Sequence, residues 1–128
     1  MRVYLAGPIF QCEDHECVHW REHAKHLLNG QHVLDPMERD YRGSTDENHV
    51  QIVEEDKALI DTCDVLLVNH LKPSVGTSME ILYAWERNKR VYAVSENGQV
   101  SPWLLYHCHR VFNNLQGAVD HIKNGGSQ

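Results

Sequence analysis

The sequence predicts an α/β protein, a single-domain Rossmann-like (flavodoxin-like) three-layer sandwich around a mostly parallel five-stranded sheet. Short β-rich runs alternate with longer helical patterns along the chain, which is typical of right-handed βαβ units. The length of 128 residues suits one compact domain. We expect this domain to span residues 1–124 and to be followed by a flexible tail, residues 125–128, with the composition of a linker.

In the first half of the chain, turn residues separate each expected element from the next. The run RVYLA, Arg2–Ala6, is a strand that stops at a Gly-Pro pair. A helical pattern covers residues 13–28 and stops at Asn29-Gly30. The run HVLDP, residues 32–36, is a brief second strand that proline ends. The polar residues 37–48 that follow predict a loop.

The second half continues the same alternation. The expected elements are a helix over 47–62, an apolar strand Val65–Val68, a helix that begins at Gly76-Thr77, a strand Val91–Val94, a short helix from Pro102 to about Cys108 and a last helix Leu115–Lys123. These patterns locate four of the five expected strands.

The positions of the strand ends predict where a ligand would bind. In parallel α/β sheets, ligands bind beyond the carboxyl ends of the strands. Here the strands end at Gly7-Pro8, Asp35-Pro36, Asn69-His70 and Ser95. The loops with the sequences GPIF, DPMERDYRG and HLKPSVGTS should therefore converge on one cleft.

Glu80 is an isolated acidic residue in the otherwise apolar run SMEILYAW. A helix that begins at Gly76-Thr77 places it in the first turn, where the helix dipole would keep the carboxylate ionised. One interpretation is a capping-box glutamate, because Thr77-x-x-Glu80 has the required spacing. The other is a carboxylate held in a pocket for chemistry. Ser74, Gly76, Thr77 and Ser78 of the same segment could supply hydroxyl and N–H groups to a phosphate.

Asp56 raises a similar question in the preceding helix. It falls in the middle of an apolar stripe formed by Ile52, Leu59, Ile60 and Cys63. A buried aspartate without a partner is costly. Asp56 therefore either makes a structural hydrogen bond to a neighbouring loop or serves the cleft, and the pattern alone favours neither.

Composition argues against several classes of function. The net charge of −6 is unsuited to binding nucleic acid polymers, and the sequence shows neither an apolar run of membrane-spanning length nor a signal-peptide pattern. Four cysteines without a CxxC pair favour a reduced, cytoplasmic protein. The chain has ten histidines, including four at helical spacing from His15 to His26, but no HExxH motif. A solvated histidine face is favoured over a zinc site, and no metal is expected.

Two carboxylates beside a loop that favours anions suggest displacement at a sugar carbon, as in retaining glycosidases. Three segments then carry a resemblance to a known family: VYLAGPIF, EEDKALIDTCDVLLV and PSVGTSMEILYAWERNKRVYAV. In this order and spacing, over nearly the whole chain, they resemble the nucleoside 2-deoxyribosyltransferase family, including its branch of 2′-deoxynucleoside 5′-phosphate N-hydrolases and nucleotide N-glycosidases.

The resemblance implies catalytic roles for Glu80, Asp56 and Tyr4. Glu80 would be the nucleophile that attacks C1′ of the sugar. Asp56 would assist departure of the base or hold the sugar, and the Tyr4 hydroxyl would lie near the glutamate. The substrate-binding positions that it implies are Gly7, Pro8, Ile9, Phe10, Ser74, Gly76 and Ser101.

Some of these positions bear on the substrate. Ser74 matches a phosphate-binding serine of the hydrolase branch, whereas the transferases tend to have aspartate there. Gly7 would let the backbone approach the ligand. Pro8 and Phe10 stand where the phosphate hydrolases have serine and arginine, and GPIF with phenylalanine is also similar to the family's cytidylate N-glycosidases. The base would face the loop of residues 35–42, although such charged loops are usually only solvated, and Trp20 is a candidate for stacking on it.

The resulting hypothesis is a hydrolase that cleaves the N-glycosidic bond of a (deoxy)nucleoside 5′-monophosphate without metal or organic cofactor. The alternatives are base exchange on a free deoxynucleoside and a nucleotide-binding module without turnover. The resemblance also implies a homodimer or larger homo-oligomer with a shared active site. Ser101, in the segment SPWLLYHC, would reach the phosphate bound by a partner chain, with Trp103, Leu104 and Tyr106 as an apolar anchor. Alternatively, Trp103 and Leu104 close the domain's own core.

Overall fold

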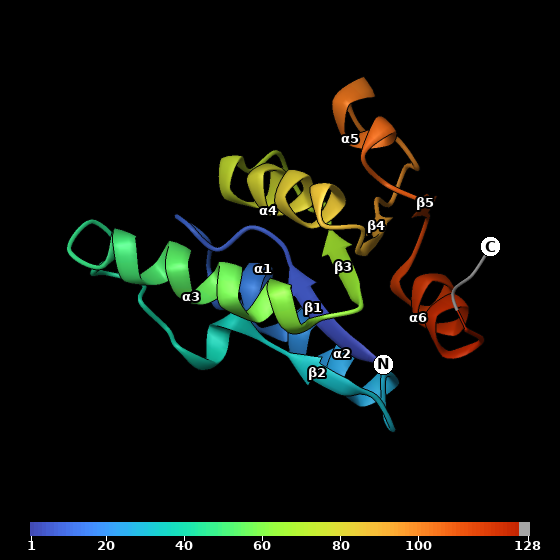
Figure 1. Cartoon of the computed structure of the whole chain (residues 1–128), viewed down its shortest axis with the longest axis horizontal. Coiled ribbons are helices and arrows are strands. Elements are labelled where there is room, and N and C mark those ends of the chain that lie inside the picture. The colour runs from blue at the N-terminus through green and yellow to red at the C-terminus, as the bar shows by residue number, and fades with distance from the viewer. Residues whose placement is uncertain (126–128) are drawn as a thin grey trace.

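The computed structural model describes residues 1–125 and has a five-stranded, entirely parallel sheet with helices on both faces (Figure 1). The strand order is β2-β1-β3-β4-β5, which is the flavodoxin-like order. The strands are β1 (Arg2–Ala6), β2 (His32–Leu34), β3 (Val65–Asn69), β4 (Arg90–Val94) and β5 (Arg110–Phe112). The predicted fold class is therefore confirmed. Of the expected tail, residues 126–128 lie outside the described residues.

The helices connect successive strands and cover the two faces. They are α1 (Asp14–Cys17), α2 (His19–Leu27), the 3₁₀ turn η1 (Pro36–Glu38), α3 (His49–Thr62), α4 (Val75–Glu86), α5 (Pro102–Tyr106) and α6 (Leu115–Lys123). One layer contains α3 and α4, which lie side by side in Figure 1, and α2 packs against α6 in the other. Within residues 1–125, no helix is long and apolar enough to cross a membrane.

Each face of the sheet has its own apolar core. Alternate side chains of β1 point to opposite faces, so Tyr4 packs with Ile60 of α3 and Ile81 of α4, whereas Leu5 packs with α2 and α6. Because both faces are covered, the central strands are apolar at nearly every position. This arrangement directs the Tyr4 hydroxyl toward the layer of α3 and α4.

Two elements differ from the sequence-based expectations. The pattern over residues 13–28 is divided into α1 and α2 at Val18, and at this break the buried Arg21 side chain donates to the Cys17 carbonyl over 2.6 Å. The fifth strand, β5, has only three residues and pairs with β4 alone. Such a short edge strand leaves no alternating pattern, which explains why its position was not predicted.

Candidate active site

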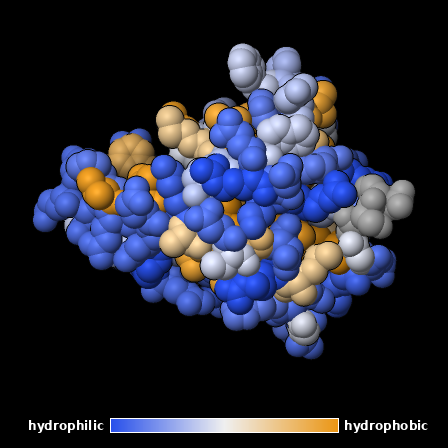
Figure 2. Space-filling view, in the orientation of Figure 1, coloured by the Kyte–Doolittle hydropathy of each residue, from blue (hydrophilic) through white to orange (hydrophobic). Residues whose placement is uncertain are grey.

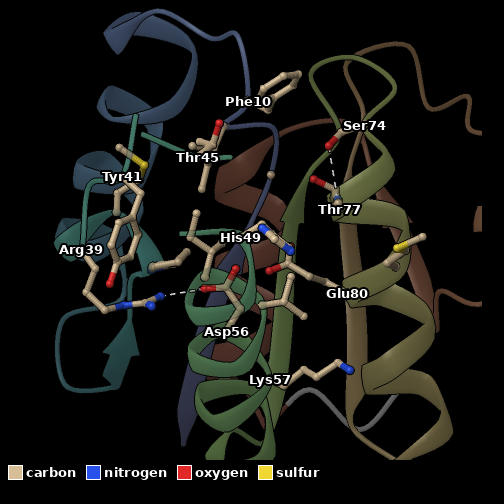
Figure 3. Close-up of a pocket in the computed structure, with 18 of the residues that line it drawn as sticks. Phe10, Arg39, Tyr41, Thr45, His49, Asp56, Lys57, Ser74, Thr77 and Glu80 are labelled. Carbon is tan, nitrogen blue, oxygen red and sulfur yellow. Dashed lines mark hydrogen bonds and ion pairs between the residues drawn. The ribbon is translucent and has the colours of Figure 1, made fainter. Parts of the chain in front are cut away.

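A cavity of about 490 Å³ opens at the carboxyl ends of the strands. Its walls come from the loop after β1, the loop after β2, the helix α3 and the first turns of α4. The prediction that the loops GPIF, DPMERDYRG and HLKPSVGTS converge on one cleft is confirmed, because residues of all three line the cavity. Figure 3 shows α3 and α4 facing each other across it.

Glu80 projects into this cavity from the second turn of α4. The helix begins at Val75, because the Ser74 side chain caps it by accepting a hydrogen bond from the Thr77 amide over 3.3 Å. The expected helix start at Gly76-Thr77 and the capping-box interpretation of Thr77 and Glu80 are therefore wrong. Glu80 is too far along the helix to cap it, and it makes a different contact.

That contact is with Tyr4, whose hydroxyl donates to the Glu80 carboxylate over 2.5 Å. Tyr4 is completely buried in the central strand β1. Burial raises the pKa of Tyr4 well above its ordinary value, and the charges of Glu80 and Asp56 raise it further. Tyr4 is therefore a fixed hydrogen-bond donor to Glu80 and stays protonated across the physiological pH range.

The free protein holds Glu80 in an environment that favours its protonated form. Burial raises the pKa of Glu80 to about 8, with a further contribution from the charge of Asp56, while the hydrogen bond from Tyr4 opposes the rise. The sequence-based expectation that the helix dipole keeps this carboxylate ionised is wrong. A second-turn position weakens the dipole effect, and desolvation outweighs it.

Asp56 also lines the cavity, from the middle of α3, and its carboxylate accepts a 2.7 Å hydrogen bond from Arg39. Burial raises the pKa of Asp56, and the paired guanidinium opposes that rise. This geometry agrees with both interpretations of Asp56 that the sequence left open. The carboxylate binds a neighbouring loop and faces the cleft (Figure 3).

Arg39 belongs to a small network that joins the loop after β2 to α3. Its guanidinium also contacts the carboxylate of Glu55, which accepts a further hydrogen bond from the Tyr41 hydroxyl over 2.9 Å. The other arginine in the wall, Arg42, pairs with Asp40 and Asp14, each over 2.7 Å. Both arginines that line the cavity are therefore neutralised by carboxylates of this chain.

The cavity includes most, but not all, of the predicted substrate-binding positions. Gly7, Ile9, Phe10, Ser74 and Gly76 line it. Pro8 is buried and lies outside the cavity wall. Ser101 caps the distant helix α5 by accepting from the Leu104 amide over 3.3 Å.

Gly7 has a packing role that the sequence did not reveal. A Cβ atom at this position would lie 2.9 Å from the Trp20 ring and 3.2 Å from the Asn69 carbonyl oxygen. Trp20 packs against the core under α2 and α6 and does not line the cavity, so the suggestion that it stacks on a base is wrong. Glycine at position 7 thus allows the first loop to lie close to the sheet.

Sequence reasoning missed several residues of the site, among them Arg21 and His49. Arg21 is fully buried behind the first loop, donates to the Gly7 carbonyl over 3.0 Å and lies 3.7 Å from Asp35. It shares a buried helix face with Cys17, Ala24 and Leu28, and this helical spacing is the sequence signal that was overlooked. His49, at the start of α3, lines the cavity, and its Nδ1 lies 2.8 Å from the Asp46 carbonyl.

Four further histidines lie on the surface of α1 and α2, outside the cavity. The side chains of His15, His19, His23 and His26 are exposed, as the solvated-face interpretation predicts. Over residues 1–125, no group of three or more His, Cys, Asp or Glu side chains is arranged to hold a metal ion.

Comparison of the chain with known proteins places this geometry in a family. The family model for nucleoside 2-deoxyribosyltransferase matches residues 3–120. A comparison with curated protein sequences gives no match. The solved structures that resemble the chain include a 2-deoxyribosyltransferase from Bacillus psychrosaccharolyticus, with 21% identity over 94% of this chain and 91% of its own and a TM-score of 0.74.

Two further structures show the same fold. The CMP N-glycosidase BcmB of Clostridium botulinum has 18% identity over 96% of this chain and 99% of its own, with a TM-score of 0.63. A conserved protein from Enterococcus faecalis V583 has 18% identity over 97% of this chain and 98% of its own, with a TM-score of 0.69. With a family model that spans nearly its whole length, the chain belongs to the nucleoside 2-deoxyribosyltransferase family.

Proposed function

We propose that the protein cleaves the N-glycosidic bond of a (deoxy)nucleoside 5′-monophosphate and releases the free base and the sugar 5-phosphate. The observation that carries this proposal is the Glu80 carboxylate, which Tyr4 holds at 2.5 Å in a cavity that Asp56 also lines. Retaining glycosidases use one carboxylate as the nucleophile and a second carboxyl group as the acid. Family membership supports glycosyl transfer or cleavage at a nucleoside.

In the proposed reaction, the proton that Glu80 carries in the free protein first passes to Asp56, and the ionised Glu80 carboxylate then forms a bond to C1′ while the bond from C1′ to the base nitrogen breaks. The bonding electron pair leaves with the base, which takes a proton from Asp56 or through a neighbouring water. Asp56, now a carboxylate, takes a proton from the water that attacks C1′ of the glycosyl ester, and Glu80 is released as a free carboxylate. Tyr4 stabilises the ionised form of Glu80 before and after this covalent intermediate.

The N-terminus of α4 supports the assignment of a phosphate group. Ser74 is the N-cap of this twelve-residue helix, Gly76 lies in its first turn, and both line the cavity. Helix N-termini attract anions. One observation favours the alternative substrate, a free deoxynucleoside. Arg39 and Arg42 are already paired with carboxylates, so neither guanidinium is available to a phosphate without rearrangement. Base exchange on a nucleoside is therefore the second candidate.

A base-release assay tests the proposal and separates the candidates. The protein is incubated with each 5′-monophosphate and with the matching nucleoside, and free base is measured by chromatography, with and without a second base. If the protein is a hydrolase, free base should be released from monophosphates without an acceptor. If it is a transferase, free base should be released only when the second base is present. Glu80→Gln should abolish release, whereas the exposed Glu86→Gln on the same helix should retain it. Binding without release from any substrate would leave only the non-catalytic module.

A further inference from the structure

Thr77 on α4 has a buried hydroxyl group that makes no hydrogen bond within the described residues. The residue is 4% exposed and lines the cavity on α4, one turn before Glu80. Within residues 1–125, its Oγ1 atom has no hydrogen-bond partner. Figure 3 shows Thr77 between Ser74 and Glu80 on the side of the helix that faces the cavity.

Folding alone gives no reason for a hydroxyl at this position. The Thr77 amide is already capped by the Ser74 side chain, and this contact uses the backbone and not the Thr77 hydroxyl. A buried hydroxyl without a partner destabilises the folded state. Valine has nearly the same shape and would fill the same space without this cost. The hydroxyl is therefore best explained by a group that arrives with a ligand.

The position of Thr77 on the helix indicates which part of the ligand that group belongs to. Ser74, Thr77 and Glu80 follow at intervals of three residues, each a rise of about 4.5 Å along one face, which is comparable with the width of a furanose ring. In the proposed function, on which this step rests, C1′ lies at Glu80 and the phosphate lies at the first turn of α4. The sugar then extends across Thr77.

We propose that the Thr77 hydroxyl binds the 3′-hydroxyl of the substrate's sugar. The 2′ carbon adjoins C1′ and so lies beside Glu80, whereas the 3′ carbon is on the edge of the ring toward the phosphate. The ring oxygen is a poor partner, because it loses electron density in the oxocarbenium-like transition state and a donor there would oppose the reaction. The 3′-hydroxyl both donates and accepts, as the threonine hydroxyl does.

The experiment compares four forms of the protein on two sugars. Wild type, Thr77→Val, Thr77→Ser and Ser78→Ala are assayed with a 2′-deoxynucleoside 5′-monophosphate and with its 2′,3′-dideoxy analogue. Ser78→Ala is the matched control, because the exposed Ser78 hydroxyl donates to the Ser74 carbonyl and does not line the cavity. Thr77→Val should lower kcat/KM about tenfold on the deoxy substrate and should have no effect on the dideoxy substrate. Thr77→Ser should restore most of the loss.

Thermal unfolding of the free proteins supplies a second readout. Thr77→Val should unfold at the same or a higher temperature than wild type, because it removes an unsatisfied buried hydroxyl. A lower unfolding temperature, or equal kinetic losses on both sugars, would overturn the proposal. A loss that appears on monophosphates of either sugar but not on free nucleosides would assign Thr77 to the phosphate instead and would equally refute the 3′ contact.

A binding measurement keeps this inference separate from the proposed activity. Calorimetric titration with 2-deoxyribose 5-phosphate and with 2,3-dideoxyribose 5-phosphate needs no turnover. Wild type should bind the first ligand more tightly, and Thr77→Val should remove that difference. If no base is released from any substrate but this pattern holds, the catalytic proposal fails and the Thr77 contact stands. If both ligands bind wild type equally, or neither binds, the Thr77 contact is refuted.

Discussion

Glu80 has to satisfy two opposing physical requirements. A nucleophilic carboxylate must be ionised, yet burial and the neighbouring Asp56 raise the pKa of Glu80 to about 8. The Tyr4 hydroxyl compensates in part by donating directly to the ionised oxygen. A carboxylate that is poorly solvated by water and held by one fixed donor is a stronger nucleophile than one in bulk solvent.

The raised pKa of Glu80 predicts how stability depends on pH. Its ordinary value is 4.5 and its folded-state value is about 8, so this group stabilises the fold fully below pH 4.5, and its contribution is lost as pH rises toward 8. Glu80→Gln removes that dependence. In urea unfolding, the variant should gain stability relative to wild type between pH 5 and pH 8. The exposed Glu86→Gln serves as the control, and a Glu80→Gln difference that is constant over this range would contradict the raised pKa.

Asp56→Asn should act on both the rate and the pH profile. The Asp56 charge is the second contribution that raises the pKa of Glu80, and its removal lowers that pKa. The acid limb of the kcat/KM profile should therefore move to lower pH, while the maximum rate falls because an amide cannot give a proton to the base. Glu54→Gln, an exposed charge on the same helix, should change neither. An active Asp56→Asn variant with an unmoved profile would make Asp56 a structural residue only.

At the level of single residues, sequence reasoning identified the carboxylates of the site but missed the arginines that contact its loops. Glu80 and Asp56 were visible as carboxylates among apolar neighbours, and the resemblance added Tyr4. The contact of Arg39 with Asp56 was not predicted, because a charged loop of this composition is usually solvated. Arg21 was overlooked because it is charged, although it shares a helix face with the buried Cys17 and Ala24, and its hydrogen bond to the Gly7 carbonyl satisfies its guanidinium there.

The helix α4 is the element that joins stability to function. Its N-cap residue, Ser74, is also the proposed phosphate contact, and three of its successive turns face the cavity with Thr77, Glu80 and Tyr83. The apolar run in which Glu80 stands out arises because α4 packs on the sheet through Ile81 and Ala84. Its first turn was placed slightly late because the cap is Ser74 and not Thr77.

Ser74→Ala should therefore produce two separable effects. Loss of the cap should destabilise the protein by about 1 kcal/mol, and loss of the hydroxyl should reduce turnover of monophosphates more than turnover of nucleosides. Asn114→Ala removes the side-chain cap of α6, which lies away from the cavity. This control should reproduce the stability loss without changing the preference between the two substrates. Equal losses for both substrates in Ser74→Ala would remove the phosphate role.

The helices and strands with the clearest periodic sequence patterns were predicted most accurately. β1 was placed with its observed bounds, and β3, β4 and the long helices were located within a few residues. The convergence of three loops on one cavity was predicted because the carboxyl ends of parallel strands lie at the same edge of the sheet, whereas the patterns of the single segments did not specify the strand order β2-β1-β3-β4-β5. The three-residue β5 depends on its pairing with β4, and the break at Val18 lies beside the buried Arg21, which donates to the carbonyls of both Cys17 and Gly7.

Apolar side chains are unevenly distributed over the surface of the molecule. The face in Figure 2 is largely hydrophilic and carries scattered apolar side chains. On α5, Trp103 is 77% exposed, Leu105 60% and Tyr106 70%, while Leu104 packs against the domain's own core. The expected anchor of Trp103, Leu104 and Tyr106 is thus corrected at Leu104, which belongs to the core. The exposed aromatic residues have the character of an interface core.

We expect this surface to join two copies of the chain, with Ser101 of one copy completing the cavity of the other. Sedimentation should then show a species heavier than the 14.8 kDa chain, and Trp103→Glu should shift it toward the monomer because a buried charge disfavours association. Mixing Glu80→Ala with Ser101→Ala should restore activity, since a mixed dimer contains one cavity with both residues intact. Leu71→Glu, an exposed apolar position elsewhere, is the control for the charge itself. A fully active monomer, or mixtures that stay inactive although both variants dimerise, would show that each chain works alone.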